Sequence, residues 1–189
     1  NSGLPKDTLF WRVNDTDRFK VATHAFYTKG PLFALLAPQG TAERTAGTAI
    51  VSVTRGATYT ASLGVFGGSN VFGCDVLWIG RKHGETTDTN VLVLAGNFKP
   101  NPSKIEFKSW TFNVGDCDEG YIRVDNNGST SGESTLYFGE VKLEKGGRYT
   151  PWEQTAESSE IVQTREMINL RVQKGDVINQ INISPESIL

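Results

Sequence analysis

Residues 120–143 read GYIRVDNNGSTSGESTLYFGEVKL, which is two strand-like stretches joined by a stretch rich in Asn, Gly and Ser. In the first stretch Ile122 and Val124 alternate with polar or aromatic residues, the pattern of a strand with one buried face. The Asn126-Asn127-Gly128 segment supplies residues that favour chain reversal. We therefore expect strands over 120–125 and 135–143. The face of the first strand opposite the core is expected to carry Tyr121, Arg123 and Asp125.

The same period-2 pattern recurs along the chain as far as residue 150, between clusters of Gly, Asn, Asp and Pro. Seven further strands are expected over residues 18–26, 32–37, 48–53, 57–66, 72–81, 90–95 and 105–114. Short strands at this spacing indicate an all-β protein with two packed sheets, rather than an α/β fold.

The composition excludes several classes of partner. The chain has 189 residues and a formal net charge of -2, with 38% hydrophobic residues, which favours neither disorder nor a surface that binds nucleic acid. Its apolar runs reach only five or six residues, as at 91–95 and 32–37, whereas a helix that spans a bilayer needs roughly 20. We expect no nucleic-acid partner and no membrane insertion.

The residues that usually carry catalysis or bind metals are sparse. The 2 His and 2 Cys have no metal-ligand spacing. The carboxylates Asp116, Asp118 and Glu119 are neighbours in one expected loop, which is a poor arrangement for the two separated carboxylates of a glycosidase and only a weak indication of Ca²⁺. Cys74 and Cys117 are compatible with one disulfide or two buried thiols, and we favour thiols. We expect no catalytic residues and no enzyme activity.

The character of the sequence changes after Thr150-Pro151-Trp152. Residues 156–172 contain neither Gly nor Pro and predict a helix, and residues 177–183 return to strand-like alternation. The helix is compatible with packing on the sandwich or with oligomerisation. The predicted domains are thus a β-sandwich at 1–152 and a helix with an extended linker or oligomerisation segment at 153–189. Because the chain begins at Asn1 without a leader, we expect it to be part of a longer polypeptide.

Aromatic residues on the expected strands are candidate platforms for stacking sugar rings, with neighbouring polar groups bonding the hydroxyls. Trp78 shares one strand face with Cys74 and Val76, so it is either a core residue or a platform. Trp110 follows two charged residues on its strand face, which indicates a position in the core or at its rim. The candidate carbohydrate-binding residues are Trp78, Trp110, Tyr121 and Arg123. The strip of Tyr121, Arg123 and Asp125 is compatible with bonding hydroxyls or with an ordinary solvated strand face.

Residues 136–146, LYFGEVKLEKG, followed by Thr150-Pro151-Trp152, resemble the closing strand of carbohydrate-binding jelly-roll modules. This form of the motif is similar to that of modules in tail-associated, receptor-binding proteins of phages that infect Gram-positive bacteria. Residues 172–186 are similar to the segment that follows such modules. The resemblance implies a galactose-binding-like jelly-roll β-sandwich that recognises saccharide on the host surface, with a short C-terminal helix and strand-like extension.

The resemblance also implies partners and a location. The implied partners are host cell-wall or capsular polysaccharide and other tail proteins, and the full-length protein is expected to be a homotrimer. The implied location is the tail tip or baseplate of a virion. Reduced Cys74 and Cys117 fit assembly in the bacterial cytoplasm. Such modules often hold a structural Ca²⁺ through a last-strand carboxylate, here Glu140, but the opening segment lacks a clear acidic partner, so no metal or cofactor is expected. Two alternatives stay open, namely a ligand-free spacer or trimer-organising domain, and an accessory module of a polysaccharide-degrading enzyme.

Overall fold

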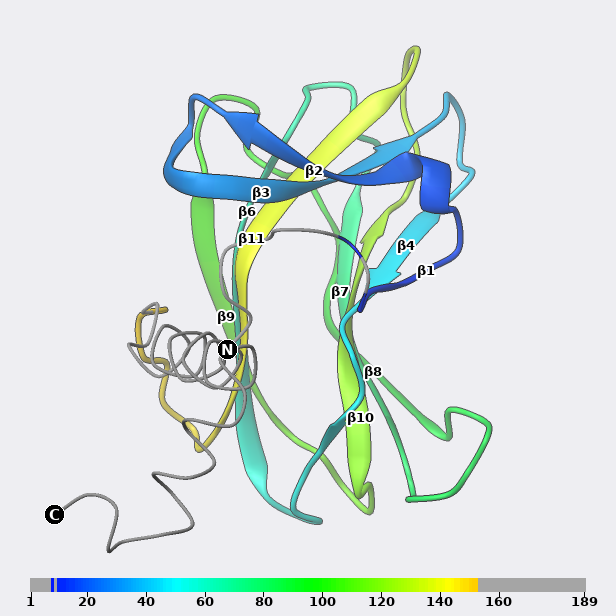
Figure 1. Cartoon of the computed structure of the whole chain (residues 1–189), viewed down its shortest axis with the longest axis vertical. Coiled ribbons are helices and arrows are strands. Elements are labelled where there is room, and N and C mark those ends of the chain that lie inside the picture. The colour runs from blue at the N-terminus through cyan, green and yellow to red at the C-terminus, as the bar shows by residue number, and fades with distance from the viewer. Residues whose placement is uncertain (1–7, 9, 153–189) are drawn as a thin grey trace, which may run out of the picture. The chain divides into compact units, whose positions relative to one another are not determined.

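The computed structural model describes residue 8 and residues 10–152, which form two antiparallel β-sheets packed face to face (Figure 1). The chain divides into two units between Trp152 and Glu153, and the helix expected over 156–172 and the extension after it lie outside the described residues. The described part contains one short 3-10 helix, η1 (Thr16–Arg18), and no α-helix. None of its helices is long and apolar enough to cross a membrane.

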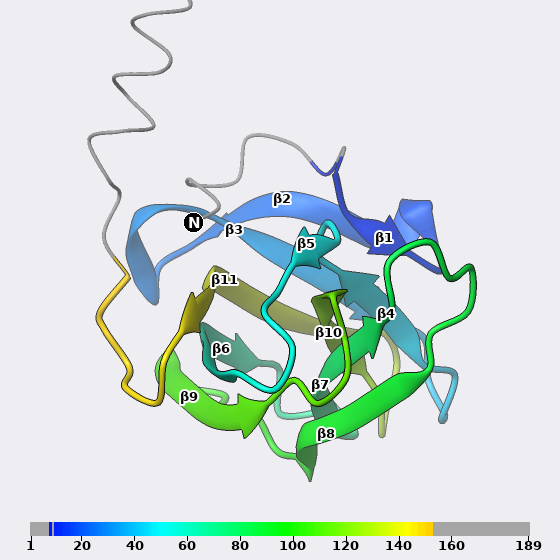
Figure 2. The ribbon, with the colours of Figure 1, turned by 90° about the horizontal axis from the view of Figure 1, so that it is seen from below.

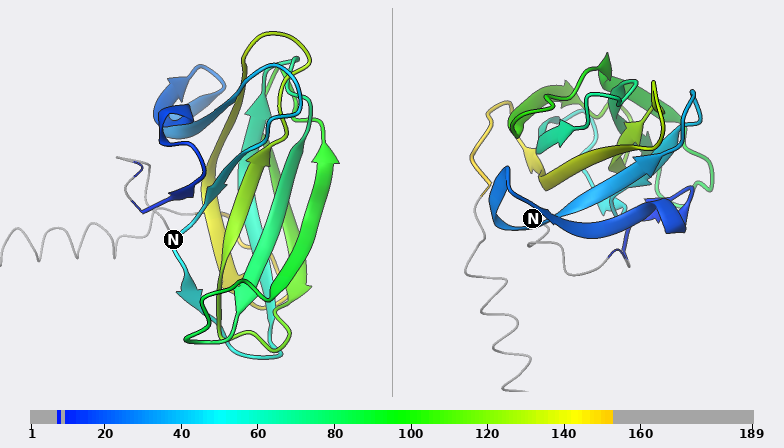
Figure 3. Two further views of the ribbon diagram at one scale, coloured as in Figure 1. Left: turned by 90° about the vertical axis from the view of Figure 1, so that its right-hand side faces the viewer. Right: turned by 90° about the horizontal axis from the view of Figure 1, so that it is seen from above.

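The first sheet, sheet A, has six strands. Five follow the spatial order β1-β4-β10-β7-β8, and β5 pairs with one end of β10. The strands are β1 (Arg12–Val13), β4 (Arg44–Gly47), β5 (Val51–Ser52), β7 (Cys74–Arg81), β8 (Asn90–Phe98) and β10 (Glu119–Asn126). Because β10 pairs with β7 along its whole length and with β4 on its other side, β10 lies at the centre of this sheet (Figure 3, left).

The second sheet, sheet B, has five strands in the order β2-β3-β11-β6-β9. The strands are β2 (Phe19–His24), β3 (Tyr27–Ala37), β6 (Thr58–Gly67), β9 (Glu106–Asn113) and β11 (Ser134–Lys145). In the view from below, the sheet curves from β2 and β3 through β11 and β6 to β9 (Figure 2). The pairing of β11 with β6 shifts register between Gly139 and Lys142, and within this bulge Glu140 has a φ of 51°.

The all-β prediction with two packed sheets is confirmed, and each of the nine expected stretches contains a strand. The expected strand at 48–53 is reduced to the two residues of β5. Two strands were missed, β1 and β4. Both are short, and β4 is held by pairing with β10, a long-range contact that leaves no local pattern in the sequence.

The core between the sheets is built around Trp78, whose side chain is completely buried. Its indole lies against Gly80 and Gly120, which are register partners on β7 and β10. A Cβ atom on Gly120 would lie 2.5 Å from a Trp78 ring carbon, and one on Gly80 would lie 2.8 Å from Nε1. The glycine pair therefore makes the space that the indole occupies. Both cysteines are buried and free.

Candidate functional site

Successive side chains of strand β10 point alternately into the core and to the outer side of sheet A, as the sequence predicts. Ile122 and Val124 are buried in the core that contains Trp78, whereas Tyr121 packs with Leu77 and Ile79 in a separate cluster. Side chains alternate between the two faces of a strand, so Arg123 and Asp125 share the outer face with Tyr121.

Strands β7 and β8 extend this outer face with apolar residues. Tyr121 lies opposite Ile79, and Arg123 lies opposite Leu77. Val91 and Val93 of β8 lie opposite the same two β7 residues and are each 58% exposed. The term face A is used below for this outer side of sheet A, formed by Tyr121, Arg123, Leu77, Ile79, Val91 and Val93. Leu77, Ile79 and Tyr121 are buried, so Arg123, Val91 and Val93 are its accessible residues.

Tyr121 is fixed in place by contacts on several sides. Its ring is only 7% exposed and packs over the bare backbone of Gly47, where a Cβ atom would lie 2.8 Å from a ring carbon. The Arg12 guanidinium carbon lies 4.8 Å from the ring centroid, and the Tyr121 hydroxyl donates a hydrogen bond to Asp88 over 3.0 Å. Burial, and then the bond to Asp88, raise the pKa of Tyr121, so this hydroxyl stays a donor. Tyr121 forms a rigid wall on face A rather than an open platform.

Arg123 is the cation of face A, and not all of its N–H groups are used in bonds within the protein. Its Nε donates to Oδ1 of Asp125 over 2.9 Å, and its Nη2 donates to Oδ2 over 2.7 Å. Glu43 lies 3.6 Å from the same Nη2. The Arg123 side chain is 31% exposed, and a guanidinium has five N–H groups, so it can also donate to a ligand.

Asp125 is the buried counterion of this cluster and is only 1% exposed. Burial is the largest cause of a rise in its pKa to about 7, with the Glu43 carboxylate acting in the same direction and Arg123 opposing it. Asp125 therefore changes charge near neutral pH, next to the donors of Arg123.

The four predicted binding residues are not brought together. Tyr121 and Arg123 share face A. The prediction that Trp78 is a binding platform is wrong, because its ring has no exposed surface for a sugar to contact. Trp110 is partly buried on β9 of sheet B and packs against the edge of the core. Glu106 and Lys108 before it are half-buried and Phe112 after it is buried, so this face of β9 passes from solvent to core.

Arg12, Glu43 and Asp88 also lie around face A and are not predicted from the sequence. Arg12 is on the two-residue strand β1, and the other two lie in loops, so no periodic pattern marks them. Their roles depend on contacts between residues 33 to 109 positions apart: Asp88 with Tyr121, Glu43 with Arg123, and Arg12 with Tyr121.

The three neighbouring carboxylates that gave a weak indication of Ca²⁺ are paired with basic side chains. Asp118 accepts from Arg55 over 2.6 Å, and Asp116 lies 2.6 Å from the Lys82 ammonium. Glu119 accepts from Arg81 over 2.7 Å. Asp116 and Asp118 lie in the loop before β10 as expected, whereas Glu119 is the first residue of β10 and its side chain is only 12% exposed. No group of His, Cys, Asp and Glu among the described residues is arranged to hold a metal ion.

Glu140, the last-strand carboxylate named as a Ca²⁺ candidate, is also engaged by protein groups. It is buried on the outer side of sheet B, where one of its oxygens accepts from the Tyr27 hydroxyl and from the Lys29 ammonium, each over 2.8 Å. This carboxylate is thus neutralised by a lysine.

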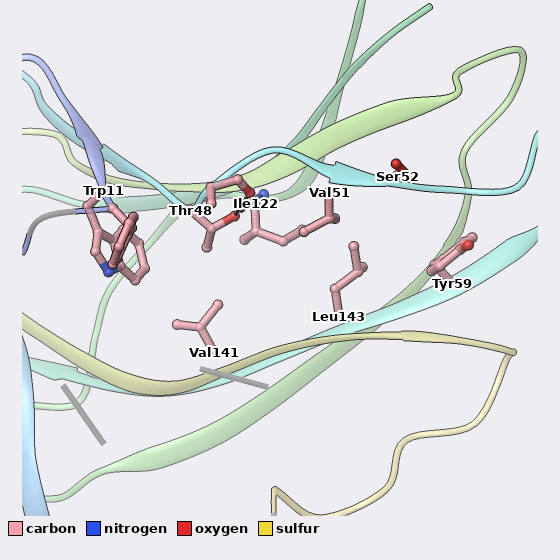
Figure 4. A pocket seen from close by; sticks show the side chains of 10 residues that line it. Trp11, Thr48, Val51, Ser52, Tyr59, Ile122, Val141 and Leu143 are labelled. Atoms are coloured by element: carbon pink, nitrogen blue, oxygen red, sulfur yellow. Dashed lines mark hydrogen bonds between the residues drawn. The ribbon is translucent and has the colours of Figure 1, made fainter. Parts of the chain in front are cut away.

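A separate cavity of about 430 Å³ lies between the two sheets (Figure 4). Its lining is mostly apolar and includes Trp11, Ile122 and Leu143. Of its hydroxyls, that of Thr48 bonds the backbone of residues 49 and 122, and that of Tyr59 accepts from the Thr54 amide. The described lining offers no charged side chain, which makes it a poor match for a sugar with many hydroxyls.

Comparisons with known proteins identify the fold. No family model matches the chain, and no curated protein matches it in sequence. The CBM22-1 xylan-binding domain from Paenibacillus barcinonensis has a TM-score of 0.53 and 10% identity, over 78% of this chain and 91% of that domain. A tailspike protein domain of bacteriophage CBA120 has a TM-score of 0.58 and 11% identity, over 75% of this chain and 20% of that one.

A cyclase from Fischerella sp. TAU is similar to the same degree, with a TM-score of 0.53 and 12% identity, over 79% of this chain and 89% of that one. At these identities the similarity establishes the architecture alone, and that architecture is the β-sandwich jelly roll of carbohydrate-binding modules.

Proposed function

We propose that this chain is a non-catalytic saccharide-binding module and that face A is its binding surface. The observation that carries the proposal is the juxtaposition on one sheet face of the spare Arg123 donors and the exposed strip of Val91 and Val93. A sugar presents C–H groups on one side of its ring and hydroxyls around its edge. The valine strip suits the first, and Arg123 with the nearby Asp88 and Glu43 carboxylates suits the second.

Within this proposal Tyr121 positions other groups. Its ring is held between Gly47 and Arg12, and its hydroxyl holds Asp88. An open, shallow surface buries little area, so each site binds weakly and affinity for a polymer comes from several modules acting together.

The setting we propose is a tail or baseplate adhesion protein of a phage that infects Gram-positive bacteria, with the module recognising host cell-wall or capsular polysaccharide. The similarity of residues 136–152 and 172–186 to such proteins supports this setting. In this proposal the full-length protein is a homotrimer that works at the bacterial surface.

A charge placed on the valine strip tests the proposed surface. We expect Val93→Asp to weaken binding of host cell-wall polysaccharide by about tenfold or more, because a sugar ring would have to desolvate the new carboxylate. Isothermal titration of the full chain with purified polysaccharide measures the change. Ser109→Asp is the matched control. It adds the same charge at an exposed position on β9 of sheet B and should leave the affinity unchanged. Equal affinities for the wild type and Val93→Asp would refute binding on face A.

The spacer alternative is favoured by one observation: the ring of Tyr121 is covered, so face A lacks an open aromatic platform. Light scattering on the full chain and on a chain ending at Trp152 distinguishes the two functions. A trimer that is lost on truncation, together with no polysaccharide binding, would favour the spacer.

A further inference from the structure

The outer surface of sheet B contains a second, smaller cavity, far from face A in the sandwich. Its volume is about 260 Å³, just below the roughly 300 Å³ at which drug-sized pockets begin. The cavity, called the hairpin cavity below, lies beside the β2–β3 hairpin, whose turn is visible on the outer side of sheet B in Figure 1. Its lining residues are His24, Phe26, Phe66, Gly67, Gly68, Asn70, Pro102, Glu133, Thr135 and Tyr137.

Four aromatic rings form one side of the hairpin cavity, and their mutual packing fixes them. Tyr137 stacks on the buried Phe66, with ring centroids 4.8 Å apart and an interplanar angle of 11°. His24 lies 4.7 Å from Phe66 and 5.0 Å from Tyr137. Phe26, at the hairpin tip, meets Phe66 edge-on at 5.5 Å and is still 38% exposed. An exposed aromatic ring held in place by others is a preformed stacking surface.

The hairpin itself is held by one of these rings. Nδ1 of His24 accepts a hydrogen bond from the Phe26 amide over 3.2 Å, which ties the turn to the ring cluster. In the neutral imidazole the proton is then on Nε2, which leaves a donor for a ligand.

Polar groups form the other side of the hairpin cavity. The Asn70 amide nitrogen donates to the carbonyls of Ser131 and Glu133, over 2.8 and 2.9 Å, and so fixes the loop that carries Glu133. The Glu133 carboxylate is paired with Arg18 and is about half exposed. In the described part of the chain the Tyr137 hydroxyl has no hydrogen-bond partner. The site thus offers a carboxylate whose charge is balanced and a free phenol.

We propose that the hairpin cavity binds a single neutral sugar ring, such as the terminal residue of a glycan. Its size fits one ring, and it combines aromatic surface with hydroxyl-bonding groups, the two features by which proteins recognise sugars. A cationic ligand fits less well, since Arg18 already neutralises Glu133 and adds a positive charge nearby. The inference does not depend on face A.

Because the hairpin cavity and face A are on the outer sides of opposite sheets, one module would contact two saccharides at once. Binding at both would raise the affinity for a dense glycan layer without any new contact, provided that both saccharides are within reach.

The test uses the full chain and four monosaccharide probes: glucose, galactose, N-acetylglucosamine and rhamnose. We expect at least one to shift the ring resonances of His24 and Tyr137 saturably in NMR titrations. Phe26→Ala should weaken that binding about three- to tenfold, because it removes the exposed stacking ring. Phe107→Ala is the matched control, since Phe107 is 49% exposed on the same side of sheet B and does not line the cavity.

Separate measurements test the hairpin cavity and face A, so one site can fail its test while the other passes. Val93→Asp should weaken polysaccharide binding at face A by about tenfold or more and leave the monosaccharide shifts at His24 and Tyr137 intact. The inference is overturned if none of the four sugars shifts these resonances, or if Phe26→Ala and Phe107→Ala weaken binding equally. A shift caused by a proline-rich peptide and by none of the sugars would also overturn it and would indicate a peptide site.

Discussion

Replacing Trp78 with Ala is expected to lower the free energy of unfolding by about 3–5 kcal/mol, the usual cost of deleting a large buried aromatic side chain. The indole is completely buried between the sheets and fills the space beside Gly80 and Gly120. The variant would leave a cavity there, because the hydrogen-bonded pairing of β7 with β10 keeps the surrounding backbone from closing into the empty space. Urea denaturation followed by circular dichroism measures the loss.

Trp78→Phe provides a second measurement should the alanine variant fail to fold. We expect it to cost about 1–2 kcal/mol, because it keeps most of the buried ring surface. The indole Nε1 has no hydrogen-bond partner among the described residues, so phenylalanine removes a buried, unpaired donor and forfeits no bond. A cost below about 1 kcal/mol for Trp78→Ala would contradict a core position and would restore this residue as a candidate platform.

Asp125→Asn is expected to change how stability depends on pH. The pKa of Asp125 is raised to about 7 in the folded protein, against about 3.9 in an unfolded chain. The folded state therefore binds the proton more tightly. The resulting stabilisation is complete below about pH 4 and is lost as the pH rises through about 7. A difference of about three pKa units corresponds to at most about 4 kcal/mol.

The measurement is the difference in unfolding free energy between wild type and Asp125→Asn at several pH values from 4.5 to 7.5. Taking the difference cancels the opposite trend of carboxyls whose pKa is lowered, such as Asp118. We expect the wild type to lose stability relative to the variant as the pH rises. Glu43→Gln should make this loss smaller and complete it at a lower pH, since it removes the like charge that helps to raise the pKa of Asp125. Parallel pH profiles for wild type and Asp125→Asn would contradict the buried-acid interpretation.

Alternation in the sequence was sufficient to predict most of sheet A and sheet B. Strand β10 is the clearest case, because Ile122 and Val124 alternate with polar and aromatic neighbours and only one side of the strand meets the core. The short strands β1 and β4 have no such pattern. They exist because β10 offers an edge for β4, and β4 in turn offers one for β1.

The candidate sites were harder to predict for a physical reason. Strand β7 is apolar on both sides, so the sequence alone left Trp78 compatible with either face. The rings of the hairpin cavity come from β2, the hairpin turn, β6 and β11, and only the folded chain brings them together. Nothing in the local sequence around His24, Phe66 or Tyr137 indicates a shared cavity.

The central claim is that saccharide binds on face A, and methyl NMR of the full chain titrated with host cell-wall polysaccharide tests it most directly. The exposed methyls of Val91 and Val93 lie at the proposed contact, whereas those of Val65 and Leu136 are buried in the core and report any global change. We expect the Val91 and Val93 signals to shift saturably while the core signals stay fixed. Saturable binding that leaves both valine signals unmoved would contradict the claim, as would the absence of any binding.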